Sequence, residues 1–558
     1  MTNPHEDPST PIVAPERVPM LDPDEIRHYV APLARAILAH ALALGLAADL
    51  LLRNGFTGLG FPLWIALVAA STLSLAWRDG RRLSHETGAW LVVAVLFAIG
   101  MAWRDAGQLQ FLDFLATLFA LGMAAIALGD PRVALRAARM RDTAFAGMAI
   151  LRAIAAGFVP LAWREMSQSV ARQELRGRFR PILRASLIAL PLLIVFGSLL
   201  RGADPVFASI IALPALDIGT IASHTVMVGF FTWVVAGWAR GALITEPARR
   251  RAPEQLPFGL AMLDVTTALG VLIGLFALYV ATQLGWFFGG ERFLRARTGL
   301  TAAAYAREGF FQMVWVVALV VPVLVGTRAA LRPGRDLERR HTALALPLIA
   351  LVGAMILSAV LRMRLYVHFY GLTTDRFYAL VLMGWLAVVL VWLSLTVLRG
   401  EGRSFAAGAV VTGLATLAAL NVAAPDVIVA GVNIARAQRP GATATPALDV
   451  GHLAQLSGEA ASLAVAAALA PSKGAVGSAE RLASDLARCT ASRVLLARWR
   501  PSGEVLARRE LDGAAWRSWN RGAASAARVV DANAPALRGV RHATCLRRSQ
   551  AVISPAGR

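Results

Sequence analysis

Residues 342–380 read TALALPLIALVGAMILSAVLRMRLYVHFYGLTTDRFYAL, and this stretch decides what kind of protein the chain forms. It opens with an apolar run of about 20 residues, the length a helix needs to cross roughly 30 Å of hydrocarbon. The helical pattern continues to Tyr370, about 43 Å in all at 1.5 Å per residue, so its last turns should project beyond the membrane. Gly371 suits the end of this helix, and Asp375 falls in the first turn of the next. The stretch predicts two membrane-spanning helices joined by a tight turn.

Similar apolar runs recur along the chain. Of its 558 residues, 57% are hydrophobic and only 16% are charged, and the mean hydropathy is +0.58. A soluble protein would carry about a quarter charged residues. Because the runs lack the alternation of barrel strands, we predict an all-α, polytopic transmembrane helix bundle. The expected spans are 33–52, 58–77, 88–103, 109–128, 183–200, 220–239, 261–287, 309–329, 342–362, 376–398 and 405–424.

The loops between these spans differ in charge, which predicts their orientation. One alternate set of loops holds about 25 arginines and the other about ten, and arginine-rich loops stay in the cytoplasm. The N-terminus is then inside and the C-terminal tail outside. Alanine is abundant and Lys473 is the one lysine, which suggests a GC-rich bacterial genome. We therefore predict a bacterial inner-membrane protein with a periplasmic tail.

Three segments fall outside the spans of this bundle, which we place within residues 31–437. Residues 1–30 are polar and proline-rich, which is typical of a disordered cytoplasmic tail. Residues 130–182 should be cytoplasmic, because both flanks of the apolar segment 144–163 are rich in arginine. That segment is long enough to cross, but an amphipathic helix on the inner surface fits the charges better. Residues 438–447 form a linker rich in Pro, Gly and Thr.

The remaining residues, 448–558, predict a helical, arginine-rich periplasmic tail. SAERLASDLARC (478–489) opens with a serine that can cap a helix, and its leucines share one face. The excess of arginine could contact anionic lipid headgroups or simply lie in solvent; we predict no nucleic-acid partner. Cys489 and Cys545 are the only cysteines. In an oxidising compartment they are candidates for a disulfide, although two buried thiols would also fit.

Familiar catalytic and metal-binding motifs are missing from the sequence. Lys473 follows no glycine loop of the P-loop kind, HETGA (85–89) has no second histidine for zinc, and there is no CxxC pair. We therefore predict no metal and no cofactor. The intramembrane acids Asp113 and Asp264 are either proton or cation sites or structural residues near span ends.

The outward-facing joints carry the residues that we single out as a candidate binding site. Four segments, 201–207, 291–311, 362–380 and 421–437, combine arginine with tyrosine, acid or asparagine on the predicted outer side. Arginine there opposes the usual charge bias, so local acids or an anionic ligand should compensate it. The candidates are Asp204, Tyr305, Arg307, Glu308, Arg362, Arg364, Tyr366, Tyr370, Asp375, Arg376 and Asn433.

Several motifs also carry a family resemblance. ADPVF (203–207), QLGWFFGG (283–290), AAAYAREGFF (302–311), the joint at 362–380, LAQLSGEA (453–460) and WRSWN (516–520) occur in that order. Together they resemble a bacterial integral-membrane family known as a domain of unknown function (the 4153/4173 group), over roughly residues 180–525. The resemblance implies a multi-spanning inner-membrane protein and carries no catalytic residue. The chain departs from it in reading LNVAAPD where Asn-Pro-Asp is expected.

Three hypotheses about function follow. We favour a non-enzymatic or transport-type protein that binds an anionic solute or a membrane lipid at the outward site. The alternative is an envelope enzyme with Asp204, Glu308 or Asp375 as acid or base and arginines holding a phosphate-bearing lipid. A third possibility is a scaffold or sensor that acts through its basic tail. The absence of a convincing internal repeat weighs against an alternating-access transporter.

Overall fold

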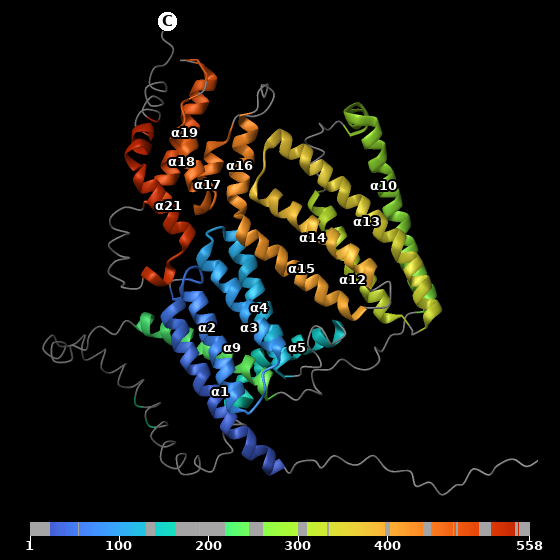
Figure 1. Ribbon diagram of the computed structural model, residues 1–558, viewed down its shortest axis with the longest axis vertical. Coiled ribbons are helices and arrows are strands. Elements are labelled where there is room, and N and C mark those ends of the chain that lie inside the picture. The colour runs from blue at the N-terminus through green and yellow to red at the C-terminus, as the bar shows by residue number, and fades with distance from the viewer. Residues whose placement is uncertain are drawn as a thin grey trace, which may run out of the picture. The chain divides into compact units, whose positions relative to one another are not determined.

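The chain is helical, as predicted, in the part that the structure describes (Figure 1). The computed structural model describes residues 23–53, 55–129, 140–162, 185, 189, 218–244, 261–298, 310–331, 334–396, 402–438, 448–472, 474–475, 478–500, 515–541 and 545. No β-sheet occurs among these residues. The prediction of an all-α, multi-pass membrane protein is confirmed.

Within these residues, nine helices are long and apolar enough to cross a membrane, and each coincides with a predicted span. They are α1 (Pro23–Leu52), α2 (Gly60–Arg78), α3 (His85–Trp103), α4 (Gly107–Gly129), α9 (Ile218–Leu243), α10 (Met262–Thr298), α13 (Arg335–Tyr370), α14 (Thr374–Thr396) and α15 (Gly402–Ala423). The predicted span 309–329 forms α12 (Phe310–Ala330), whose apolar stretch is shorter. Of the predicted span 183–200, only residues 185 and 189 are among those described, so this span stays a prediction.

The chain divides into two compact units. The first comprises Met1–Leu46, Ser71–Arg82 and Leu151–Thr245. In it the ring of His40 lies 3.3 Å from the Ser74 hydroxyl and 2.9 Å from the Ala36 carbonyl. His40 therefore joins α1 to α2, the structural role that a single histidine on an apolar helix usually has.

The ambiguous segment 144–163 is a broken helix. Helix α5 (Met140–Ala156) ends before Gly157, and a short turn, α6 (Phe158–Pro160), follows. The end of α5 packs closely on α9, since a Cβ at Gly237 would lie 2.6 Å from the Ala153 carbonyl oxygen. That segment 144–163 lies flat on the membrane surface stays a prediction.

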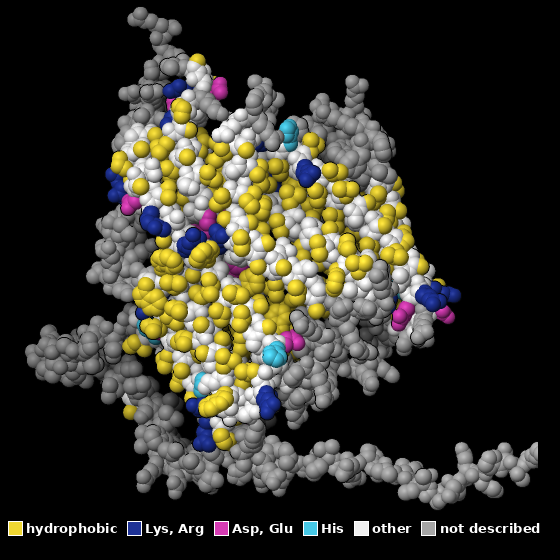
Figure 2. Space-filling model, in the orientation of Figure 1, with side chains coloured by type: hydrophobic (Ala, Val, Ile, Leu, Met, Phe, Trp, Pro, Cys, Tyr) yellow, Lys and Arg dark blue, Asp and Glu magenta, His cyan; other side chains and the backbone are white. Residues whose placement is uncertain are grey.

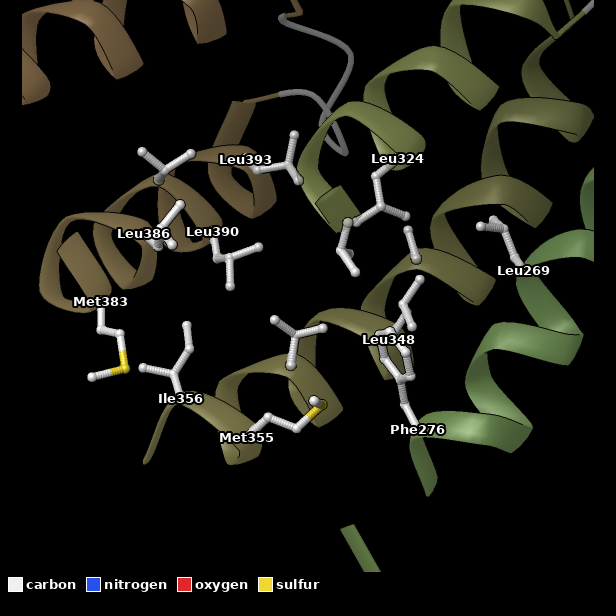
Figure 3. Close-up of a cluster of buried hydrophobic side chains, with 14 of the residues drawn as sticks. Leu269, Phe276, Leu324, Leu348, Met355, Ile356, Met383, Leu386, Leu390 and Leu393 are labelled. Carbon is white, nitrogen blue, oxygen red and sulfur yellow. The ribbon is translucent and has the colours of Figure 1, made fainter. Parts of the chain in front are cut away.

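The second unit comprises Ala47–Ala70, Leu83–Ile150 and Glu246–Arg558. A cluster of buried side chains in this unit lies between α10, α12, α13 and α14 (Figure 3). Leu269, Leu324, Leu348 and Leu393 are almost completely buried there. The outward sides of the same helices are apolar too, as lipid requires (Figure 2). Asp264 begins α10 and accepts a hydrogen bond from the Ala261 amide at 2.9 Å, so this acid caps a helix.

The C-terminal part of this unit is a small helical subdomain that we call the tail. It contains α17 (Val450–Gln455), η6 (Gly458–Ala460), α18 (Ala461–Leu469), α19 (Ala479–Trp499), η7 (Ala515–Ser518) and α21 (Arg521–Ala532). Its core includes Leu372 after α13 and Val429 of α16 (Pro425–Ala437), so the tail packs on the ends of membrane helices. Cys489 and Cys545 form a disulfide, with Cα atoms 5.7 Å apart.

The predicted start of α19 is correct, but the face predicted to be apolar points outward. Ser478 accepts a hydrogen bond from the Arg481 amide at 3.1 Å and so caps the helix. Leu482 and Leu486 are 56% and 42% exposed, whereas Leu495 is buried in the tail core. Helix spacing identifies residues on one side but does not say which side meets a neighbour.

Candidate functional site

The joint between α13 and α14 has the predicted turn at Gly371. Its φ is +78°, a value that favours glycine, and its amide donates to the Val367 carbonyl at 2.9 Å. Asn433 of α16 then fixes the next residue, because its side chain accepts from the Leu372 amide at 2.8 Å and donates to the Leu372 carbonyl at 2.7 Å. A Cβ on Gly371 would lie 2.6 Å from this amide oxygen. The turn and Asn433 therefore fit each other closely.

The arginine of this joint is held by its own neighbours. Arg376 donates to the Gly371 carbonyl at 2.5 Å, and its guanidinium lies 4.2 Å from the centroid of the Tyr366 ring. The ring centroids of Tyr366 and Tyr370 are 4.8 Å apart. Arg376 thus closes the turn, a role that does not require an external anion.

The acids of the joint tie it to other helices and to the tail. Asp375 accepts from the Gln108 side chain of α4 at 2.6 Å. Thr374 donates to Asp426 of α16 at 3.4 Å, and Asp426 also accepts from the Ser457 amide of the tail at 2.8 Å. These contacts bring together two of the four predicted outer segments, 362–380 and 421–437.

Of the remaining candidate residues, the structure describes Arg362 and Arg364. Arg362 is buried in α13, whereas Arg364, two positions further along the same helix, is exposed. Their side chains lie in different surroundings. The candidates in the other two outer segments, Asp204, Tyr305, Arg307 and Glu308, lie outside the described residues, so their part in a site stays a prediction.

A second polar centre lies at the short loop between α3 and α4. Arg104, 8% exposed, donates to the Asn421 carbonyl at 2.6 Å and to the Val422 carbonyl at 3.1 Å. These are the last carbonyls of α15, where the helix dipole favours a cation. Burial lowers the pKa of Arg104, and Glu459 partly offsets this effect. Arg104 remains a buried cation that closes the end of a helix more than 300 residues away.

The tail holds this loop through reciprocal hydrogen bonds. Asp105 accepts from the Gly458 amide at 3.0 Å, and Glu459 accepts from the Asp105 amide at 2.7 Å. Asn520 donates to the carbonyls of Met101 and Arg104 at 3.0 and 2.7 Å. Burial raises the pKa of the Asp105 carboxyl, although the bond from Gly458 and the charge of Arg498 oppose the shift. These carboxylates are used as caps for backbone amides.

Beside this loop, α4 and α15 meet through a buried acid and an amide. Asp113 is completely buried, and Asn421 donates to its Oδ1 at 2.7 Å. Thr117, one turn further along α4, donates to the Asp113 carbonyl at 2.8 Å. The contact is close to α3 as well, because a Cβ on Gly100 would lie 2.5 Å from Asp113 Oδ2.

A groove of about 1290 Å³ runs between α3 and α15 and ends at this polar centre. Its middle is apolar and is formed by Val93, Leu96 and Phe97 of α3 and by Val411, Leu414 and Ala418 of α15. His85 and Glu86 lie at one end, and Trp103, Arg104 and Arg521 lie at the other. Arg521 is exposed and its guanidinium lies 4.1 Å from the centroid of the Trp103 ring. We call this the α3–α15 groove.

One protein family matches most of the chain. A family model described as a domain of unknown function (DUF4153) matches residues 91–467. The chain belongs to this family. The match begins earlier than the resemblance in the sequence suggested and ends before the WRSWN motif. No curated protein and no solved structure matches the chain.

The DUF4153 region contains most of this polar centre, of which sequence reasoning singled out only Asp113. Arg104, Asp113, Asn421 and Glu459 lie within it, whereas Arg521 comes from the tail beyond it. Two features of the sequence could have indicated this polar centre. A charged pair interrupts two apolar runs in WRDAGQ (103–108), and LAQLSGEA, noted only as part of a resemblance, contains the residues that contact that pair.

Proposed function

We propose that this protein binds an anionic lipid in the α3–α15 groove, with the lipid headgroup at Arg104 and Arg521 and its hydrocarbon chain along the apolar middle. The observation that carries the proposal is the placing of two arginines at one end of a groove whose middle is apolar, between two membrane-spanning helices. A phosphate-bearing headgroup would complement that charge.

The dimensions of the groove support a lipid rather than a small solute. Helix α3 borders the groove from His85 to Trp103, and its 19 residues extend about 29 Å, close to the thickness of the hydrocarbon layer. Along this length the exposed side chains of the groove include Leu96 of α3 and Val411 of α15. Such a surface gains little from a polar solute but fits an alkyl chain, while Trp103 lies at the depth of the headgroups.

The charges at the headgroup end support an anion. In the part of the chain described, no carboxylate forms a salt bridge with Arg521, and the guanidinium of Arg104 is directed to carbonyl oxygens. Arg521 therefore offers its donors to a ligand, and Arg104 adds positive charge behind them. This differs from Arg376 in the joint at Gly371, whose donor and ring contacts are internal.

The side of the membrane follows from the loop charges. The arginine-rich loops support a cytoplasmic N-terminus, which puts Arg104, Arg521 and the tail on the outer side. The disulfide between Cys489 and Cys545 fits an oxidising compartment. We therefore infer a bacterial inner-membrane protein whose groove opens its charged end to the outer leaflet.

Lipid binding can be tested with the full chain in nanodiscs of phosphatidylcholine, with or without phosphatidylglycerol. We expect native mass spectrometry to detect retained phosphatidylglycerol in the wild type and several-fold less in Arg521→Gln. Arg528→Gln is the matched control, because Arg528 is exposed on the same helix but does not border the groove. Equal loss in both variants, or no preference for phosphatidylglycerol, would refute the proposal.

The apolar part needs a separate test. Ala418 borders the groove, whereas its neighbour Ala419 is exposed on α15 without bordering it. Ala418→Trp should fill the groove and reduce lipid retention, and Ala419→Trp should leave it unchanged. If both variants retain lipid like the wild type, the hydrocarbon chain does not occupy the groove.

A further inference from the structure

The contact between Asp113 and Asn421 leaves two acceptor oxygens without donors. Asn421 donates to Asp113 Oδ1 at 2.7 Å, which accounts for one oxygen of the carboxyl group. Asp113 Oδ2 and Asn421 Oδ1 are both buried, and neither has a hydrogen-bond partner among the residues described. Unsatisfied buried acceptors are costly, especially inside a membrane.

These two oxygens converge on one place. A Cβ built on Gly100 would lie 2.5 Å from Asp113 Oδ2 and 3.0 Å from Asn421 Oδ1. Glycine at this position therefore provides the room that the acid–amide pair occupies. Two acceptors brought together in this way repel each other unless a proton or a cation lies between them.

The charged and titratable neighbours do not supply a missing donor. From the loop after α3, Arg104 is close enough to act on Asp113 electrostatically, but it donates to the carbonyls of Asn421 and Val422. From α14, Tyr378 also acts on Asp113, and its buried hydroxyl has no partner among the described residues. Asp426 and Glu459 also act on Tyr378 electrostatically and add negative charge to its surroundings.

We propose that Asp113 is a proton-binding site, and that its protonated Oδ2 donates to Asn421 Oδ1. The acid and the amide then form two hydrogen bonds with each other, one in each direction, and each of the four oxygen and nitrogen atoms has a partner. The protonated acid–amide pair is neutral, whereas an ionised Asp113 would leave a buried anion whose carboxylate has a single hydrogen bond.

Release of this proton would alter the groove wall. Asn421 and Gly100 border the α3–α15 groove, and the pair joins α4 to α15. Loss of the proton would place two facing acceptors at that contact and weaken it. This site depends only on residues of the membrane helices, so it can exist whether or not a lipid occupies the groove.

Infrared spectroscopy of the purified full chain tests the proposal directly. We expect a protonated-carboxyl C=O band at neutral pH in the wild type and its loss in Asp113→Asn. Asp375→Asn is the control, because Asp375 is exposed and bonded to Gln108, and this variant should keep the band. Labelling the wild type with carboxyl-¹³C aspartate should shift the band, which assigns it to an aspartate, and its loss in Asp113→Asn then assigns it to Asp113. A wild-type spectrum without that band would overturn the proposal.

A salt series separates a proton from a cation. With ionic strength held constant by choline chloride, the thermal midpoint of the wild type should not depend on sodium concentration. A sodium-dependent rise in the wild type that is absent in Asp113→Asn would overturn the proton site in favour of a cation site. Asp113→Asn should keep the wild-type midpoint at neutral pH, because a second amide can form the same two hydrogen bonds; a large loss would contradict the pairing.

Discussion

The joints at Gly371 and at Arg104 both turn the chain between two membrane helices and both contain an arginine, but they are held in different ways. Arg376 bonds to its own turn and stacks on the tyrosine of the preceding helix. Arg104 instead bonds to carbonyls of α15, 317 and 318 residues along the chain, and its loop is covered by the tail. The arginine of the first joint acts locally, whereas the arginine of the second holds distant parts of the same unit together.

The largest expected difference is between the two arginines. Arg104→Ala should lower the free energy of unfolding by about 3 kcal/mol, because it leaves the end carbonyls of α15 and the carboxylate of Glu459 without their buried cation. Arg376→Ala should cost about 1 kcal/mol, the value of a partly exposed ring contact and one hydrogen bond. Thermal unfolding of both variants in detergent measures the difference. An equal or larger loss for Arg376→Ala would contradict the view that the two joints are held in different ways.

Asn433 tests, within the Gly371 joint itself, whether a distant contact contributes more stability than a local one. It is the distant residue of that joint, and Asn433→Ala would leave the amide and the carbonyl of Leu372 unsatisfied in a buried place. We expect a loss of about 2 kcal/mol, larger than for Arg376→Ala. If the two variants are equally stable, distant contacts are not what distinguishes a strong joint from a weak one.

The sequence predicted the local features and not the distant ones, for a physical reason. Membrane thickness fixes the length of each span, and Gly371 acts within its own turn, so a short window contains the information. Arg104 and Asn421 meet only because α3 and α15 come together, and no spacing in the sequence encodes that contact. Likewise, the leucines of α19 share a face as predicted, but their neighbours decided that Leu495 rather than Leu482 is buried.

Two glycines on α3 test how tightly the Arg104 end of that helix is packed. A Cβ on Gly100 would meet Asp113 and Asn421, whereas a Cβ on Gly88 would meet nothing within 4 Å. Gly100→Ala should therefore cost about 1–2 kcal/mol, while Gly88→Ala should be neutral or slightly stabilising because alanine favours a helix. Thermal midpoints of the pair provide the measurement. Equal effects would mean that the acid–amide pair can move away from α3 freely.

The smallest expected effect is a change of stability with pH that arises from Asp105, in the loop between α3 and α4. Burial raises the pKa of Asp105, so the native state holds this proton more tightly than the unfolded chain does. The stability that this adds is fully present below the ordinary pKa of about 4 and is lost as the pH rises through the raised value. Asp105→Asn cannot titrate, yet its side-chain oxygen can still accept from Gly458. The stability of this variant relative to the wild type should therefore increase from about pH 4 towards neutral pH. A relative stability that stays constant or falls over that range would show that the Gly458 bond and Arg498 outweigh burial at Asp105.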